Sequence, residues 1–146
     1  MGPSVPSEPT LNTAAPIDES ERGEINRGAC GDNLTWVLTG DGTLTISGTG
    51  EMYKYDEDDE KEEYQPWYMY ANNITSVIFH DGITKIGYYA FSDCDGITNV
   101  TIPNSVNSIS EGAFVNCSNL QTVDLGDGCS LGDMAFAYCP VKNLNL

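Results

Sequence analysis

The chain has 146 residues, enough for one domain, and its 22 acidic and 6 basic side chains give a formal net charge of −16. This charge argues against nucleic acid as a partner, because phosphate is repelled and no basic patch is present to release its counterions. It also disfavours anionic membrane surfaces, and no stretch approaches the ~18 apolar residues needed to cross a bilayer, so membrane insertion is not expected.

Residues 1–20 are predicted to form a flexible linker, because four prolines lie among Ser, Thr, Ala and Asn with few large apolar residues. Such a segment buries too little surface to offset the entropy lost on ordering. The alternative is a rigid stalk that holds the following module away from a cell wall. The segment contains no apolar signal core, so an exported form is expected to have lost its signal peptide.

Residues 21–73 are expected to form an N-terminal cap followed by a degenerate first repeat. Alternating apolar positions in 34–38 and 44–46 flank Gly40-Asp41-Gly42, a pattern that predicts a β-hairpin. The repeats that follow need such a cover for their first coil. Trp36 alternates in phase with its neighbours, which favours packing over the alternative role of a sugar-stacking platform.

An acidic run, DEDDEKEE, occupies residues 56–63 and is predicted to be a solvated loop. The alternative is a calcium site, but the run lacks the spaced ligands and central glycine of an EF-hand loop. Counting back 23 residues from Ala90-Phe91 places Trp67-Tyr68 where the later repeats carry Ala-Phe.

Residues 74–146 contain a repeat of about 23 residues. Ala90-Phe91 recurs as Ala113-Phe114 and then, with one residue lost, as Ala135-Phe136. Each copy has an alternating segment such as 100–102, which predicts a half-buried strand, whereas 89–92 lacks a β-branched run and is expected to form a short helical turn. A fixed period in this range predicts a solenoid whose stacked coils bury one continuous core.

The motif I-x-x-I-x-x-x-A-F-x-x-C-x-x-[IL]-x-x-V-x-[IL], from Ile83 to Ile102, resembles the BspA-like branch of the leucine-rich repeats. The resemblance extends over residues 74–146. It implies a β-dominated α/β repeat fold, a leucine-rich-repeat solenoid with one short strand and one short helical turn per coil and the β-hairpin as cap. It also implies a secreted or bacterial cell-surface protein that serves binding and adhesion and is not an enzyme.

Five cysteines are present, and Cys94, Cys117 and Cys139 share one column of the predicted stack. A column position is a packing position, so buried free thiols are expected. Disulfides are the alternative, since an exported protein meets an oxidising environment. Cys129 falls in the column of Ile83 and Val106. The sequence contains no Cys-x-x-Cys spacing for zinc, so neither a metal nor a cofactor is expected.

Catalytic chemistry is not indicated. His80 is the only histidine and follows a predicted strand, no exposed thiol is expected beside it, and no glycine-rich phosphate loop opens a helix. The absence of these constellations predicts a protein that is not an enzyme.

A binding surface is the stronger hypothesis. The outward strand positions of a solenoid align across coils into one face, here named the ladder face. It is polar and poor in the Trp, Tyr and Arg typical of hot spots, which predicts weak or avidity-driven binding of an extracellular protein or glycan. Tyr88, Tyr89 and Tyr138 on the far side are the alternative surface. The predicted ladder-face residues are Ser76, Ile78, His80, Asn99, Thr101, Asn104, Thr122, Asp124, Asn143 and Asn145, with Asp127 beside them.

Two function classes therefore remain: an adhesion-like binding module, and a structural spacer with no ligand of its own. The segment 141–146 is predicted to be a strand in phase with its predecessors, and its edge has no cover in this sequence. Two explanations fit, namely further repeats in a longer protein or two chains that cover each other's ends. The second explanation predicts self-association through the C-terminal coil.

Overall fold

The computed structural model describes residues 24–53 and 65–145, so the predicted linker and the acidic run lie outside the described residues. The described part is built from short strands and one short 3-10 helix. The elements are β1 (Glu24–Gly31), β2 (Leu34–Thr39), β3 (Thr43–Gly48), β4 (Gly50–Glu51), η1 (Tyr68–Asn73), β5 (Ser76–Phe79), β6 (Ile83–Ile86), β7 (Asn99–Thr101), β8 (Ser108–Ile109), β9 (Thr122–Asp124), β10 (Ser130–Leu131) and β11 (Asn143–Asn145).

The cap is an antiparallel three-stranded unit, β1-β2-β3, in which β2 and β3 form the hairpin that the sequence predicts. At its turn the Gly42 amide donates to the Thr39 carbonyl oxygen at 3.0 Å, and Gly42 has a φ of 86°. Asp41 accepts bonds from the Thr39 hydroxyl at 2.6 Å and from the Thr43 amide at 3.1 Å, which together lower the pKa of its carboxyl group. The turn residues thereby determine the register of the hairpin.

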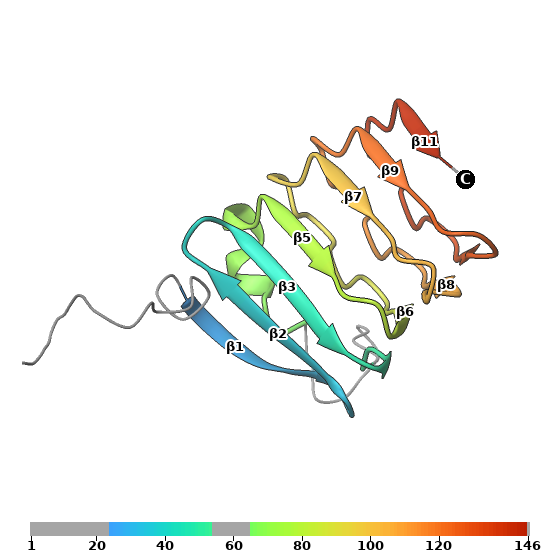
Figure 1. Cartoon of the computed structure of the whole chain (residues 1–146). Coiled ribbons are helices and arrows are strands. Elements are labelled where there is room, and N and C mark those ends of the chain that lie inside the picture. The colour runs from blue at the N-terminus through green and yellow to red at the C-terminus, as the bar shows by residue number, and fades with distance from the viewer. Residues whose placement is uncertain (1–23, 54–64, 146) are drawn as a thin grey trace, which may run out of the picture.

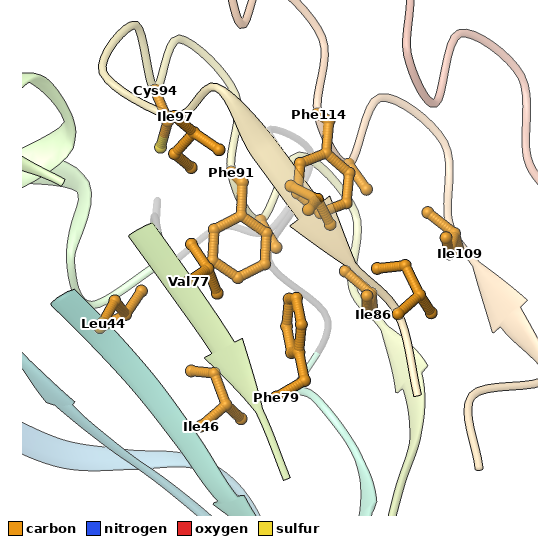
Figure 2. Close-up of a cluster of buried hydrophobic side chains, with 14 of the residues drawn as sticks. Leu44, Ile46, Val77, Phe79, Ile86, Phe91, Cys94, Ile97, Ile109 and Phe114 are labelled. Atoms are coloured by element: carbon orange, nitrogen blue, oxygen red, sulfur yellow. The ribbon is translucent and has the colours of Figure 1, made fainter. Parts of the chain in front are cut away.

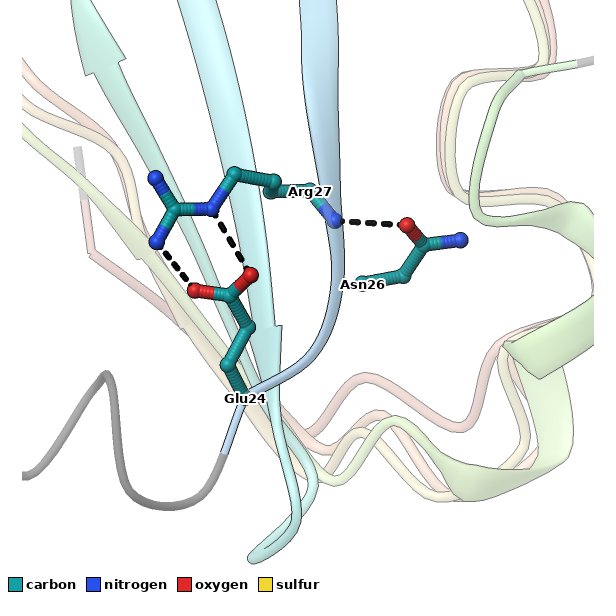
Figure 3. A network of polar contacts seen from close by, with 3 residues as sticks. All are labelled: Glu24, Asn26 and Arg27. Atoms are coloured by element: carbon teal, nitrogen blue, oxygen red, sulfur yellow. Dashed lines mark hydrogen bonds and ion pairs between the residues drawn. The ribbon is translucent and has the colours of Figure 1, made fainter.

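Strand β1 was not expected from the sequence pattern. Its exposed face carries a local network in which the Arg27 guanidinium pairs with the Glu24 carboxylate and the Asn26 side chain accepts the Arg27 amide (Figure 3). The hydrogen bond from Arg27 lowers the pKa of Glu24. Because the alternation in β1 is broken by two register shifts, period-two analysis does not detect this strand.

The repeats join the cap edge to edge, because β3 pairs in parallel with β5. Beyond β5, a second set of parallel strands follows in the order β7-β9-β11, with Val100 opposite Val123 and Val123 opposite Leu144. Figure 1 shows β3, β5, β7, β9 and β11 in succession along the stack. Equivalent residues of successive repeats therefore lie side by side, as the 23-residue period predicts.

Each repeat also contains a second strand, which was not expected. Strands β4, β6, β8 and β10 pair in parallel and form another sheet, here named the second sheet. Its members have two to four residues. Strands this short are too brief to show an alternation of apolar and polar residues in the sequence. They are recognised only from their pairing with neighbouring strands in the structure.

The expected helical turn at 89–92 is wrong. Tyr89 and Asp93 have φ angles of 50° and 62°, and their equivalents Gly112 and Asn116 have 64° and 62°. The left-handed conformation of Tyr89 lies outside the right-handed helical region, and residues 89–92 form hydrogen-bonded turns instead of a helix. Alternate amides here donate to the next coil, such as Phe91 to Ala113 at 2.7 Å, while those between them close local turns. The segment is a third ladder between coils.

One hydrophobic cluster fills the space enclosed by the strands and these turns. Its centre is a column of rings: Trp67 stacks on Phe91, Phe91 on Phe114 and Phe114 on Phe136, with centroids 5.1 to 5.2 Å apart. Figure 2 shows Phe91 and Phe114 among the aliphatic side chains of the facing strands. Trp67 itself heads the column, whereas the sequence register placed Tyr68 there, and Tyr68 is exposed. Trp36 is buried against Trp67, as its packing interpretation predicts.

The cysteine column is present, and all five cysteines are free thiols in the structure. Cys94 and Cys117 are fully buried, and the Cys117 thiol donates to the Phe91 carbonyl oxygen at 3.1 Å. Burial raises the pKa of the Cys94 thiol to about 12. Cys139, the last member of the column, is only half-buried, so full burial holds for Cys94 and Cys117 alone; Cys129, which lies outside the column, is also half-buried.

Candidate functional site

The predicted ladder face occupies the outward side of β5, β7, β9 and β11. Val77, Val100 and Val123 point into the core, and period two places their neighbours outward. Ser76 and Thr122 are half-buried and the other predicted residues through Asn143 are exposed, while the side chain of Asn145 lies outside the described residues. Asn104 and Asp127 follow the ends of β7 and β9, at the margin of the face.

The cap extends this face, which the sequence analysis missed. Thr43 and Thr45 of β3 lie directly opposite Ser76 and Ile78 of β5. The Ser47 hydroxyl and Nδ1 of His80 are 3.2 Å apart, so the histidine is tied to the cap strand. The alternation of Thr43, Thr45 and Ser47 with buried apolar residues was the available signal, because parallel pairing of β3 with β5 makes it continuous with the repeats.

A depression interrupts the ladder face between β5 and β7. These neighbouring strands belong to separate sheets, so no ladder of backbone hydrogen bonds joins them, unlike the pairs on either side. The space between them has a volume of about 390 Å³. The interruption coincides with Phe79, which stands where the next repeats carry Ile102 and Leu125 and whose ring packs edge-on against Phe91, 5.6 Å away. Its wall contains four predicted site residues: Ser76, Ile78, Asn99 and Thr101.

The chemistry of the face is that of hydroxyl and amide groups around one apolar contact. Ile78 is 46% exposed in the depression, and Asp124 is the acidic residue of the outward strand positions. Backbone groups on the facing edges of β5 and β7 add donors and acceptors. This arrangement suits hydrogen bonding to a ligand surface. Among the described residues of the face, His80 contacts the Ser47 hydroxyl and not a carboxylate, so it forms no acid–base pair there.

The tyrosines proposed as an alternative surface do not act as one group. Tyr88 lines the second sheet, Tyr89 donates its hydroxyl to the Glu111 carboxylate at 2.8 Å, and Tyr138 is 75% exposed on the last coil. Among residues 24–53 and 65–145, no group of three His, Cys, Asp or Glu side chains is placed to hold a metal ion. No described helix is long and apolar enough to cross a membrane.

The family comparison and one solved structure agree with this architecture. The family model of the BspA-type leucine-rich repeat region matches residues 65–146 in 6 copies. A leucine-rich repeat protein from Eubacterium ventriosum is similar in structure, with a TM-score of 0.58, 26% identity and coverage of 82% of this chain and 40% of its own. A leucine rich cell surface protein from Faecalibacterium prausnitzii aligns with a TM-score of 0.37 at 17% identity, covering 78% of this chain and 49% of its own.

No curated protein matches the chain. The chain spans well under half the length of the Eubacterium protein, and the family match covers more than half of the chain's own 146 residues. The match begins at residue 65, so it includes the coil of Trp67 as well as the repeats after Ile74. The protein belongs to the BspA-type leucine-rich repeat family.

Proposed function

We propose that this chain is a binding module of a bacterial cell-surface or secreted protein, and that its ladder face binds an extracellular protein or glycan in an adhesion-like role. The observation that carries the proposal is the depression between β5 and β7, where Ser76, Ile78, Asn99 and Thr101 converge on one space. A ligand there meets side-chain hydroxyl and amide groups and one exposed isoleucine. It also meets backbone groups of β5 and β7, two strands that are not hydrogen-bonded to each other.

Membership of the family supports an extracellular location, and the polarity of the face supports the kind of binding. Small polar side chains give modest affinity per contact, because hot spots are dominated by Trp, Tyr and Arg. Several copies of the module presented together would then supply avidity. The proposal therefore predicts a weak monovalent interaction that strengthens when the module is displayed in an array.

The test uses the purified chain presented multivalently on beads and applied to arrays of host extracellular proteins and glycans. A ligand found there is measured against the double variant Asn99→Ala/Thr101→Ala. The matched control is Asn72→Ala/Asn107→Ala, which removes two exposed amides away from the depression. We expect the first variant to lose at least about tenfold in affinity with an unchanged melting temperature, and the control to bind normally.

The competing function is a spacer that displays neighbouring domains and has no ligand of its own. It predicts no reproducible ligand for the multivalent module. Equal binding by the chain and the Asn99/Thr101 variant would also contradict the proposed role of the depression.

A further inference from the structure

The second sheet carries two adjoining hollows that the ladder face does not include. One, of about 230 Å³, lies where β4, which follows the cap in sequence, meets β6, and the other, of about 400 Å³, continues over β8 and β10. Lys85, Tyr88 and Ser110 line both hollows. We name the two together the seam groove, and none of its lining residues belongs to the ladder-face depression.

Ser110 is the most informative residue of the groove. It is 7% exposed, and its hydroxyl has no hydrogen-bond partner in the described structure. The equivalent positions in the coils on either side are Gly87 and Gly132, so packing in this column does not require a hydroxyl. A buried polar group without a partner is costly, so a ligand group that reaches the Ser110 hydroxyl from the adjoining hollows gains the hydrogen bond that the fold leaves unmade.

Lys85 adds a cation at the same place. It lies on β6 between Glu51 of β4 and Ser108 of β8, its side chain is half-buried, and it forms no ion pair with a described carboxylate. Arg27, by contrast, is paired with Glu24 on the far edge of the cap (Figure 3). The ammonium group of Lys85 offers three donors, and together with Ser110 it places hydrogen-bond donors at the junction of the two hollows.

The remaining walls indicate the class of ligand. Asp32 and Glu51 line the first hollow, and Glu111 and Asp133 line the second. Four carboxylates against one ammonium repel phosphates, sulfates and acidic polymers, whereas carboxylates accept hydrogen bonds from uncharged hydroxyl groups. Tyr53 lines the first hollow and Tyr88 lines both, and tyrosine side chains combine an apolar ring with a polar hydroxyl, which suits contact with a sugar.

The size of the groove agrees with this chemistry. Drug-sized ligands occupy pockets of about 300–1,000 Å³, so a hollow of 230 Å³ suits a single ring. The second hollow gives room for its continuation along the stack. We propose that the seam groove binds a neutral saccharide of two or more rings, with one ring in the first hollow, which Tyr53 and Tyr88 line, and its hydroxyl groups bonded to Lys85, Ser110 and Glu51.

The experiment is a calorimetric and NMR titration of the full chain with cellotriose, maltotriose, mannotriose and triacetylchitotriose. A sulfated oligosaccharide and an oligolysine peptide serve as charged probes. We expect at least one neutral trisaccharide to bind and to shift the amide signals of Lys85 and Ser110. Binding of none of the neutral probes, or a clear preference for oligolysine or for the sulfated probe, would overturn the proposal.

Three variants test the site itself. Lys85→Gln is expected to weaken binding about tenfold, with Lys142→Gln, an exposed lysine elsewhere, as the matched control. Ser110→Ala is expected to weaken it about threefold to tenfold while the melting temperature stays the same or rises, because an unpartnered hydroxyl is removed. Tyr88→Ala is expected to abolish saccharide binding.

The ladder-face variant Asn99→Ala/Thr101→Ala should bind the saccharide normally, which separates this site from the proposed function. Unchanged saccharide binding by the three groove variants would place the site elsewhere and refute the assignment.

Discussion

The indole nitrogen of Trp67 donates a 2.7 Å hydrogen bond to the carbonyl oxygen of Ala90. In the next two coils the equivalent carbonyl oxygens, of Ala113 and Ala135, accept from the backbone amides of Phe91 and Phe114. The Trp67 side chain therefore replaces a backbone donor at the top of the third ladder, while its ring continues the aromatic column. One residue thus connects the cap to the repeats by both packing and hydrogen bonding.

Trp67→Phe should accordingly destabilise the protein more than its change in volume requires. The variant keeps a stacked ring but leaves the buried Ala90 carbonyl oxygen without this donor, which costs about 1–3 kcal/mol in addition to lost packing. The matched control is Trp36→Phe, because the Trp36 indole nitrogen is buried without a partner. Urea unfolding should show the larger loss for Trp67→Phe. Equal losses in the two variants would mean that the hydrogen bond contributes nothing.

The sequence predicts the columns of the core well and the backbone path between them poorly. A recurring Ala-Phe-x-x-Cys pattern identifies Phe91, Phe114 and Cys117 as buried, because stacking must place equivalent side chains together. The turn at Tyr89 escaped detection because its positive φ is imposed by the bonds to the next coil, and tyrosine has no preference for that region.

For the candidate site too, the outward residues could be predicted from the sequence, whereas the hollows that they line could not. Outward positions such as Asn99 and Thr101 follow from period two and could be named from the sequence. The depression exists because β5 and β7 are not joined by backbone hydrogen bonds. The spacing between two strands cannot be predicted from the residue types of either strand, so the sequence carries no signal for it. The seam groove depends on strands of two to four residues, so its wall residues Lys85 and Ser110 could not be grouped before the fold was known.

Gly112→Ala tests the left-handed turn. Gly112 has a φ of 64°, and a Cβ atom there would lie 2.5 Å from Cδ1 of Tyr89 on the adjacent coil. Strain and overpacking together should cost about 2–4 kcal/mol of unfolding free energy. In a Tyr89→Ala background the clash is relieved, so the same change should cost only about 1–2 kcal/mol. Asn116→Ala, at a φ of 62°, serves as a control without the ring. Additive losses in the double variant would show that the Tyr89 ring is not the obstacle.

Thiol labelling tests burial along the cysteine column. With Ellman's reagent under native conditions, the half-buried Cys129 and Cys139 should react, while Cys30, Cys94 and Cys117 should stay protected. In guanidinium chloride all five should react. Peptide mapping by mass spectrometry assigns the labelled sites. Rapid native labelling of Cys94 or Cys117 would be incompatible with the stacked coils, because both are fully buried.

The same thiols predict a loss of stability in alkali. Burial raises the pKa of Cys30 and of Cys94 to about 12, whereas an unfolded cysteine has a pKa of about 8.5. Above that lower value the unfolded chain releases protons that the folded chain retains, so the free energy of unfolding falls as pH rises towards 12. The expected slope is about 1.4 kcal/mol per pH unit for each thiol. Urea melts from pH 7 to about 10 measure it, and the slope should be shallower in Cys94→Ala. A free energy of unfolding that is flat over this range would contradict the burial.

For the 146-residue chain by itself we propose self-association through the coil that carries β10 and β11. Among the described residues, nothing accepts a hydrogen bond from the amides of Met134, Phe136 and Tyr138, whereas the equivalent amides of the two preceding coils donate to the next coil. Leu144 is 48% exposed on β11, whose described pairing is with β9 alone. A second copy placed against this coil would satisfy the amides and cover the leucine.

The charge of −16 opposes such contact, so association should be weak at low salt and should strengthen as salt screens the repulsion. Static light scattering over protein and salt concentration measures the effect for the 146-residue chain.

Leu144→Asn should reduce the association constant about tenfold or more, because it removes apolar contact area from the edge. Ile25→Asn is the matched control, since Ile25 is 50% exposed on β1 at the opposite end of the stack. A mass that stays monomeric at millimolar protein in high salt, or equal effects of the two variants, would show that the C-terminal coil does not mediate pairing.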